Sequence, residues 1–255
     1  MQTGRERLSS GQLYASMNYF IPASKDAPSV ADSAEAMRMI GVTFRKQGNL
    51  DMALEHGRNA MHEAIASQQP QPISGAARDL AATLHALGVF TAKDRAANLR
   101  EALALYVYSL EQDRLARQKP FDDTAEPGAQ YSVTLGMKAL LLYDMAHYRI
   151  WINDDGSEPA RLYRHEAHIE KRRAIGMLRE AYRQLRGNNS LSWQLNNLLK
   201  FIQVAPRSEK RGLMDEARHL LVHYPHRANE VRIARLGRRA MRLALKLKVM
   251  YMHIF

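Results

Sequence analysis

Histidines beside carboxylates are the residues of this sequence best suited to hold a metal ion. His165 and His168 flank Glu166, while Glu216, His219 and His223 follow one another at helical spacing. A zinc helix of metalloprotease type needs two histidines four residues apart with a glutamate between them. The first pair is three residues apart, and no further ligand follows the second group at a recognisable distance. We interpret both groups as surface or packed histidines and predict no metal site.

Other catalytic arrangements are missing from the sequence. The chain has no cysteine, which removes thiol catalysis, disulfides and cysteine-based zinc sites. No glycine-rich loop suited to phosphates and no nucleophile elbow occurs, and acidic pairs such as Asp154 and Asp155 fall in polar, loop-like stretches. We therefore expect no cofactor and no enzymatic activity, because a helical enzyme built on the histidine-rich middle region lacks a recognisable constellation.

Composition favours a helical protein. Hydrophobic residues make up 46% of the 255 residues, and glycine (14) and proline (9) are sparse. Alanine, leucine, methionine, arginine and glutamate lose little side-chain freedom in a helix. The polar start lacks a signal-like apolar run and no stretch is long enough to span a bilayer, so we expect a cytoplasmic protein.

Two amphipathic helices follow an irregular lead-in that we predict over residues 1–31. Apolar residues recur at three- and four-residue steps from Ala34 to Phe44 and again from Leu50 to Ile65. Asp32 and Ser33 are candidate N-caps of the first helix. The break at residues 46–49 is a short turn, which makes the two helices antiparallel.

This pair resembles one tetratricopeptide repeat over residues 34–61. The positions that carry the resemblance are Met37, Ile40, Gly41 and Phe44 in the first helix, Gly48 in the turn, and Ala53 and Ala60 in the second helix. Gly41 and Ala53 must be small because the helices cross there. Gly57 departs from the family pattern, in which an aromatic residue is usual at this position.

Further pairs are predicted along residues 32–227. The second covers 76–116, the third 130–151 and 160–186 with an enlarged loop at 153–159, and the fourth 190–204 and 208–223. The spacing between equivalent alanines exceeds the standard unit of about 34 residues, so the array is irregular. The predicted fold is an all-α solenoid of stacked antiparallel helix pairs, closed by a capping helix.

The capping helix is predicted over 228–253, within a C-terminal segment of residues 228–255. Residues 207–255 contain 12 Lys or Arg against 4 Asp or Glu, a net charge of +8 out of the +11 of the whole chain. One face of the predicted helix carries Arg232, Arg235, Arg239, Arg242 and Lys246. This face is either a solvated outer surface or a contact for nucleic acid, an acidic protein or an anionic membrane.

The resemblance also implies a peptide-binding groove lined by the first helix of each pair. In the first repeat these residues would be Arg38, Val42, Arg45 and Lys46, whose three cations suggest an acidic ligand. Chaperone-binding members of the family clamp a terminal carboxylate with an asparagine where this chain has Val42, which argues against that clamp. We expect a protein-interaction scaffold that holds a peptide or helix of a partner. The alternative is RNA or ribonucleoprotein binding through the basic C-terminal helix.

Overall fold

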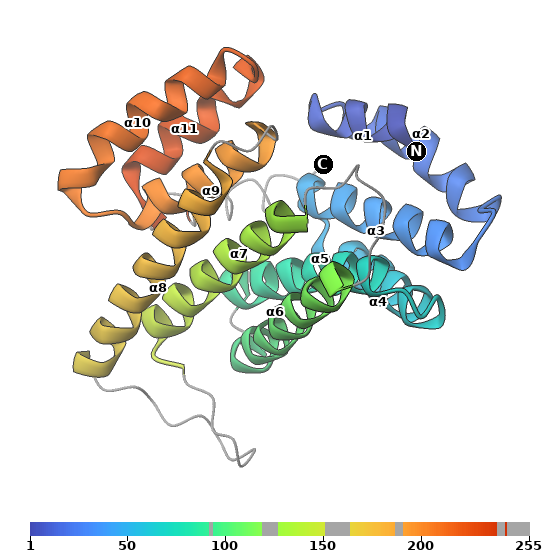
Figure 1. The fold of residues 1–255 in the computed structure, drawn as a ribbon, viewed down its shortest axis with the longest axis horizontal. Helices are drawn as coiled ribbons and strands as arrows, with labels where there is room; N and C mark the ends of the chain where they lie inside the picture. Colours follow the sequence, from blue (N-terminus) through green and yellow to red (C-terminus); the bar gives the residue numbers. More distant parts are fainter. Residues whose placement is uncertain (92–93, 119–126, 151–163, 187–190, 239–242, 244–255) are drawn as a thin grey trace.

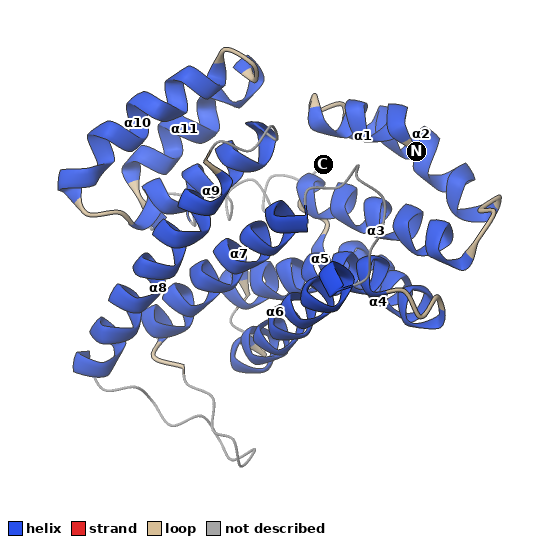
Figure 2. Cartoon of the chain, viewed as in Figure 1, coloured by secondary structure: helices blue, strands red, loops and turns tan. Residues whose placement is uncertain are grey.

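The structure is a computed structural model that describes residues 1–91, 94–118, 127–150, 164–186, 191–238 and 243. Within these residues the chain is all-α and contains no β-strand (Figure 2). In chain order the α-helices are α1 (Gln2–Ser9), α2 (Leu13–Lys25), α3 (Val30–Gln47), α4 (Leu50–Ala66), α5 (Pro70–Phe90), α6 (Arg95–Gln118), α7 (Pro127–Tyr148), α8 (Arg164–Leu185), α9 (Leu191–Val204), α10 (Arg207–Leu221) and α11 (Ala228–Leu236). A short 3-10 helix, η1 (Pro225–Arg227), precedes α11.

The helices form an α-solenoid of two layers, as predicted. Each helix packs against the next one in the chain (Figure 1). The odd-numbered helices from α3 to α11 also contact one another in sequence, whereas consecutive even-numbered helices have few mutual contacts. We call the odd-numbered set the inner layer and the even-numbered set the outer layer. This arrangement confirms the predicted stacking of helix pairs.

The first predicted pair, α3 and α4, shows why its small residues are needed. A Cβ added to Gly41 would lie 3.4 Å from the Ala53 carbonyl oxygen and 3.4 Å from the Gly57 nitrogen. The helices therefore touch at Gly41 and Ala53, as the sequence predicts. Residue 57 is glycine and not the aromatic residue usual in the repeat because there is little space for a side chain. A Cβ there would lie 3.2 Å from Leu80 Cδ1 of α5.

The turns around α3 follow from three short polar or flexible residues. Ser29, not the predicted Asp32 or Ser33, is the N-cap of α3, and its hydroxyl accepts the Asp32 N–H at 3.1 Å. At the other end Gly48 has φ 92°, a left-handed conformation that closes the helix. Asn49 then caps α4 through the Met52 N–H.

The prediction of an irregular lead-in over residues 1–31 is wrong. This segment forms the α1–α2 hairpin, which packs on α3 through Leu8 and Phe20 against Met39 and Ile40. Gly4 makes the close approach of α1 and α2 feasible, because a Cβ there would lie 2.6 Å from the Phe20 ring. The cost of Gly in a helix is offset by this packing.

The later pairs occur where the sequence places them. The second is α5–α6, the third α7–α8 and the fourth α9–α10. The prolines at 70 and 72 separate the first two pairs as predicted, but Pro70 also begins α5, at a position where its missing N–H costs no hydrogen bond. The predicted enlarged loop at 153–159 lies outside the described residues.

The final helix is shorter than predicted. α11 ends at Leu236, and Gly237 adopts φ 96° and ψ 177°, which interrupts the helix predicted over 228–253. The apolar stripe alone does not reveal this break, because a glycine fits a helical pattern until its backbone is seen to turn. Val231 and Ala234 of α11 are buried in the core formed with α9 and α10, so this helix does cover the end of the stack.

Candidate functional site

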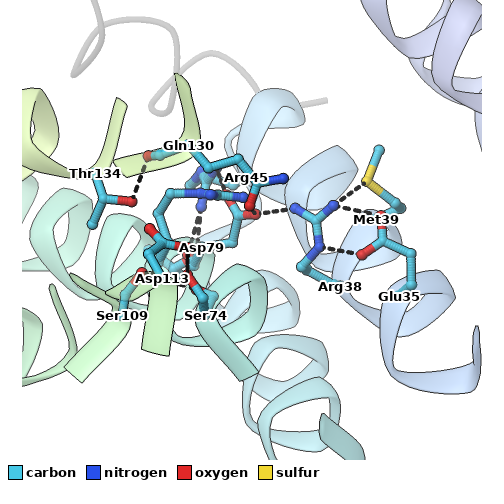
Figure 3. Close-up of polar contacts among 12 residues, drawn as sticks. Glu35, Arg38, Met39, Arg45, Ser74, Asp79, Ser109, Asp113, Gln130 and Thr134 are labelled. Carbon is cyan, nitrogen blue, oxygen red and sulfur yellow. Dashed lines mark hydrogen bonds and ion pairs between the residues drawn. The ribbon is translucent and has the colours of Figure 1, made fainter. Parts of the chain in front are cut away.

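The four residues of the predicted groove lie on α3, in the inner layer. Two of their cations are paired inside the chain with Asp79 of α5 (Figure 3). Arg45 Nη2 lies 2.9 Å from Asp79 Oδ1, and Arg45 Nη1 donates to the Asp79 carbonyl oxygen at 2.6 Å. Arg38 bridges Asp79 and Glu35, with its Nε 2.7 Å from Glu35 Oε2. Both guanidinium groups thus stabilise the contact between α3 and α5.

Electrostatics at Asp79 agree with this structural role. Burial alone would raise the pKa of Asp79, but the charges of Arg38, Arg45 and Arg78 outweigh burial and hold that pKa well below its usual value. The Arg38 pKa is raised by Glu35 and Asp79 against the opposing effect of burial. The carboxylate therefore remains ionised, and it competes with any acidic ligand for these arginines.

Val42 and Lys46 lie under or beside the N-terminal hairpin. Val42 packs in the apolar cluster that contains Leu8 and Phe20. The Lys46 ammonium donates to the Leu8 carbonyl oxygen at 3.5 Å, near the C-terminus of α1, and burial together with Arg227 lowers its pKa. The α1–α2 hairpin, which sequence reasoning missed, thus occupies part of the face assigned to a ligand.

A groove with a largely apolar lining opens between helices of the outer layer. It has a volume of about 910 Å³ and lies across α6, α7 and α8. Its apolar lining comes from Leu103, Ala104, Val107, Tyr108, Leu142 and Met177. Val107 is 48% exposed and Tyr108 38% exposed, so large apolar side chains of α6 face solvent here.

The rim of this groove carries both charge signs in equal number. Its charged residues are Arg100, Lys138, Arg173, Glu101, Glu111 and Glu170. Glu111 is paired with Arg114 at 2.6 Å, and the pKa of Lys138 is lowered by burial and by Arg173. An apolar floor with a mixed charged rim is the usual composition of a protein-binding groove. The sequence offered one signal for it, the adjacent Val107 and Tyr108 on a helix whose opposite face is buried.

A buried polar network fixes the inner layer. Asp144 of α7 is fully buried and lies 2.9 Å from His85 Nε2 of α5 and 2.5 Å from Arg238 Nη2. Arg238 Nη1 also donates to Gln203 Oε1 of α9 at 2.9 Å. Burial would raise the Asp144 pKa, yet Arg238 and His85 together hold it well below its usual value. The left-handed Gly237 lets the chain aim Arg238 at this network.

The histidines weighed as metal ligands lie apart from one another in two places. His165 and His168 are exposed near the start of α8, where they border a cavity of about 620 Å³ with His147, Arg149 and Lys171. His168 Nε2 accepts a hydrogen bond from Arg172. Among the described residues no group of three or more histidines or carboxylates is placed to hold a metal ion.

The second group of histidines and carboxylates, Glu216, His219 and His223, does not lie on one helix. α10 ends at Leu221, so His223 lies beyond the helix that carries Glu216 and His219. This corrects the expectation that all three share one helical face. Glu216 is instead 3.4 Å from Arg186, which directly follows the outer-layer helix α8.

The predicted basic face is described only in part. Arg232 and Arg235 are exposed on α11, whereas Arg239, Arg242 and Lys246 lie outside the described residues. Because α11 ends at Leu236, these five residues do not belong to one uninterrupted helix. No helix of the described residues is long and apolar enough to cross a membrane.

Comparisons with known proteins find likenesses among solved structures. No family model matches the sequence, and no curated protein matches it. Among solved structures, the chain is similar to one described as the nearly identical TPR-like repeats of a kinesin light chain from Podosopora anserina. The identity is 12%, the TM-score is 0.45, and the match covers 91% of this chain and 92% of the other.

Proposed function

We propose that this protein is a helical scaffold that holds an amphipathic helix of a partner protein in the outer groove across α6, α7 and α8. The observation that carries the proposal is the solvent-facing apolar surface of Val107 and Tyr108 above the floor made by Leu142 and Met177. A helix with apolar residues at positions i, i+3, i+4 and i+7 buries such a surface. We assign a binding role and no catalysis to the chain.

The proposed groove does not include the α3 residues that the sequence predicted to line one, because those residues are engaged inside the chain. Arg38 and Arg45 form ion pairs with Asp79, and Val42 packs beneath the α1–α2 hairpin. Within the described residues α6 and α8 have few mutual contacts, and Lys138 and Leu142 of α7 line the groove between them. The inner-layer face therefore supports the stack, and the outer groove supports recognition.

Site-specific photocrosslinking tests this function. A benzoylphenylalanine placed at Val107, in cells of the native host, should crosslink to one reproducible helical peptide of a partner. Tyr108→Glu in the same chain should abolish that crosslink, because a charge in an apolar groove is costly to bury. The matched control carries the crosslinker at Ile65 of α4, which is 52% exposed and lies outside the groove. Equal crosslinking from both positions, or none from Val107, would refute the proposal.

The alternative of nucleic-acid binding keeps one supporting observation. Arg232 and Arg235 are exposed on α11 and have no ion pair among the described residues. If they contact phosphates, affinity for an RNA oligonucleotide should fall by orders of magnitude between low and moderate salt. Replacing both arginines with glutamine should weaken that binding and leave the Val107 crosslink unchanged.

A further inference from the structure

The outer groove lies between two helices that run in the same direction, α6 and α8. At one end of the groove, the Arg95 guanidinium of α6 lies 4.3 Å from the ring centroid of Tyr148, the last residue of α7. At the other end, the hydroxyl of Ser132, near the start of α7, donates to Gln184 Oε1, near the end of α8, at 2.8 Å. Both contacts show that α7 runs antiparallel to its two neighbours. The groove therefore follows the helix axes, which suits a ligand helix that lies along them.

One face of α6 forms a wall of this groove. Its lining residues are Arg100, Ala104, Val107, Tyr108 and Glu111, which recur at three- and four-residue steps and so share one side of the helix. Arg100 lies seven residues before Val107, which is about two turns or ~10 Å along the axis. A helix that buries Val107 and Tyr108 along this face therefore also passes Arg100.

Arg100 has no partner in the part of the chain that the structure describes. Its Nε atom is buried without a hydrogen-bond acceptor, and no described carboxylate lies within ion-pair distance of its guanidinium, not even that of the adjacent Glu101. The residue as a whole is half-buried, so water reaches only part of the group. A buried donor without an acceptor is unfavourable, and a native structure tolerates such a group where a ligand supplies the acceptor.

Lys138 of α7 is a second cation of the groove without a counter-charge. It is half-buried one turn before Leu142, and no described carboxylate lies within ion-pair distance of its ammonium. Burial and the charge of Arg173 both lower its pKa. Because both effects oppose the ammonium form, a carboxylate brought into the groove would gain a favourable contact here.

The carboxylates of the rim differ from these two cations. Glu111 is paired with Arg114 at 2.6 Å, and Glu170 lies 3.8 Å from Arg173. Glu101 is exposed, so water solvates its charge. Water satisfies an exposed charge at no cost, whereas a half-buried charge stays partly desolvated until a partner arrives. Among the described residues, the rim thus has equal numbers of both signs but lacks a negative partner for its recessed cations.

We propose that the partner helix held by the outer groove is acidic, with one carboxylate beside its apolar stripe bound by Arg100 and a second paired with Lys138. This inference rests on the proposed function and names the chemistry of its partner. A carboxylate offers two oxygens that match the guanidinium fork, and the apolar contacts around the pair exclude water. A basic helix with the same apolar stripe would add like charge beside Arg100, which makes this arginine a determinant of specificity.

Two fluorescent model peptides of about 18 residues test the charge preference by anisotropy with the full chain. Both are alanine-rich helices with leucine at positions i, i+3, i+4 and i+7, and they differ only in carrying glutamate or glutamine beside the stripe. The wild type should bind the glutamate peptide about tenfold more tightly. Equal affinity for both peptides would overturn the inference and leave helix binding intact, whereas binding of neither would refute both.

A matched pair of variants separates a contact at Arg100 from general attraction to a basic chain. Arg100→Gln should lose most of the preference for the glutamate peptide. Arg58→Gln, on the exposed surface of α4, removes the same charge outside the groove and should keep the preference. Equal losses in the two variants would show that net charge alone attracts the peptide, and the inference would fail.

The stability of the free chain gives a second measurement. Arg100→Met removes no hydrogen bond or ion pair among the described residues and keeps a long side chain with an apolar stem. It should therefore raise or preserve the urea midpoint of unfolding while it removes the preference for the glutamate peptide. A clear fall in the midpoint would show that Arg100 serves the fold and would overturn its assignment to a ligand.

The Val107 crosslink in the native host separates this inference from the function on which it rests. Adding Arg100→Gln to the crosslinking chain should weaken the crosslink several-fold, whereas adding Arg58→Gln should not. The crosslinked peptide should carry Asp or Glu beside its apolar stripe. A crosslink of unchanged intensity in Arg100→Gln, or a peptide flanked only by Lys and Arg, would overturn the acidic partner and leave the helix-binding function standing. Absence of any Val107 crosslink would refute that function itself.

Discussion

Replacing Lys200 with methionine should stabilise the fold at pH 6. It should also remove a rise in the free energy of unfolding with pH that the wild type shows above pH 7. Burial, together with the charges of Arg227, Arg78, Arg238 and Arg45, lowers the pKa of the wild-type Lys200 ammonium from 10.5 to about 7. This gap corresponds to at most ~5 kcal/mol of cost to the folded state when Lys200 is protonated. Because the Lys200 side chain keeps partial solvent contact, we expect the actual cost to the folded state to be roughly half of this upper limit.

The loss of the hydrogen bond from Lys200 to Asn197 reduces the stabilisation expected from the methionine substitution. Methionine leaves Asn197 Oδ1 without the Lys200 donor, which costs about 1 kcal/mol or more. The expected net stabilisation at pH 6 is therefore roughly 1–2 kcal/mol.

The sign of the pH dependence follows from proton binding. Between pH 7 and 10.5 the unfolded chain holds the Lys200 proton and the folded chain does not, so wild-type stability rises with pH relative to the variant. Above pH 10.5 both states are neutral, and the variant should be less stable by the lost hydrogen bond.

Urea unfolding of both proteins from pH 6 to 10, monitored by helical circular dichroism, measures this difference. Chloride buffers free of sulfate and phosphate prevent a multivalent anion from pairing with Lys200 and masking the effect. Because all other titrating groups are common to the two proteins, the difference between the curves isolates Lys200. Two stability curves that run parallel over the whole pH range would show that burial and the neighbouring arginines do not perturb this lysine, and the reasoning would fail.

Three other substitutions test the packing that positions the site, each by urea unfolding. Asp144→Asn should cost about 3–5 kcal/mol, because it leaves Arg238 recessed without its counter-charge; a loss under 1 kcal/mol would contradict that role. Gly237→Ala should cost about 1–3 kcal/mol, because φ 96° with ψ 177° is a region that only glycine adopts readily; an unchanged midpoint would argue against the turn. Gly41→Leu should cost about 2 kcal/mol or more, whereas Gly41→Ala should cost little, since a single Cβ lies at 3.4 Å from the Ala53 oxygen; equal effects would contradict the helix crossing.

Much of the fold could be predicted because it depends on local spacing. Gly41 and Ala53 are small residues at helical intervals on either side of a turn, so the sequence alone places their helices in contact. The same periodicity yields the later pairs to within a few residues. The N-terminal hairpin escaped prediction because Gly4 and Pro22 look like helix breakers in sequence. Only the contact of Gly4 with Phe20 shows that the glycine serves close helix packing.

The roles of the charged residues could not be predicted in the same way. Arg38 and Arg45 occupy the helical positions that a ligand-binding face would use, and no local pattern shows that Asp79 lies opposite them. One signal was present: Arg78 and Asp79 are the charged pair of α5, a helix that is otherwise mostly apolar. A charged pair in an apolar helix indicates a partner across the interface, although its identity depends on how the layers stack.

The buried network around Asp144 also changes how this solenoid should unfold. In an ideal repeat array each unit touches only its neighbours, so the ends can fray without disturbing the middle. Here Arg238, which follows the last described helix, pairs with Asp144 of α7 and thereby with His85 of α5. Opening α11 would expose a desolvated carboxylate two helix pairs away, which couples the C-terminal end to the centre of the stack. Native-state hydrogen exchange should therefore show α7 and α11 opening together in the wild type, and Asp144→Asn should let α11 exchange faster than α7.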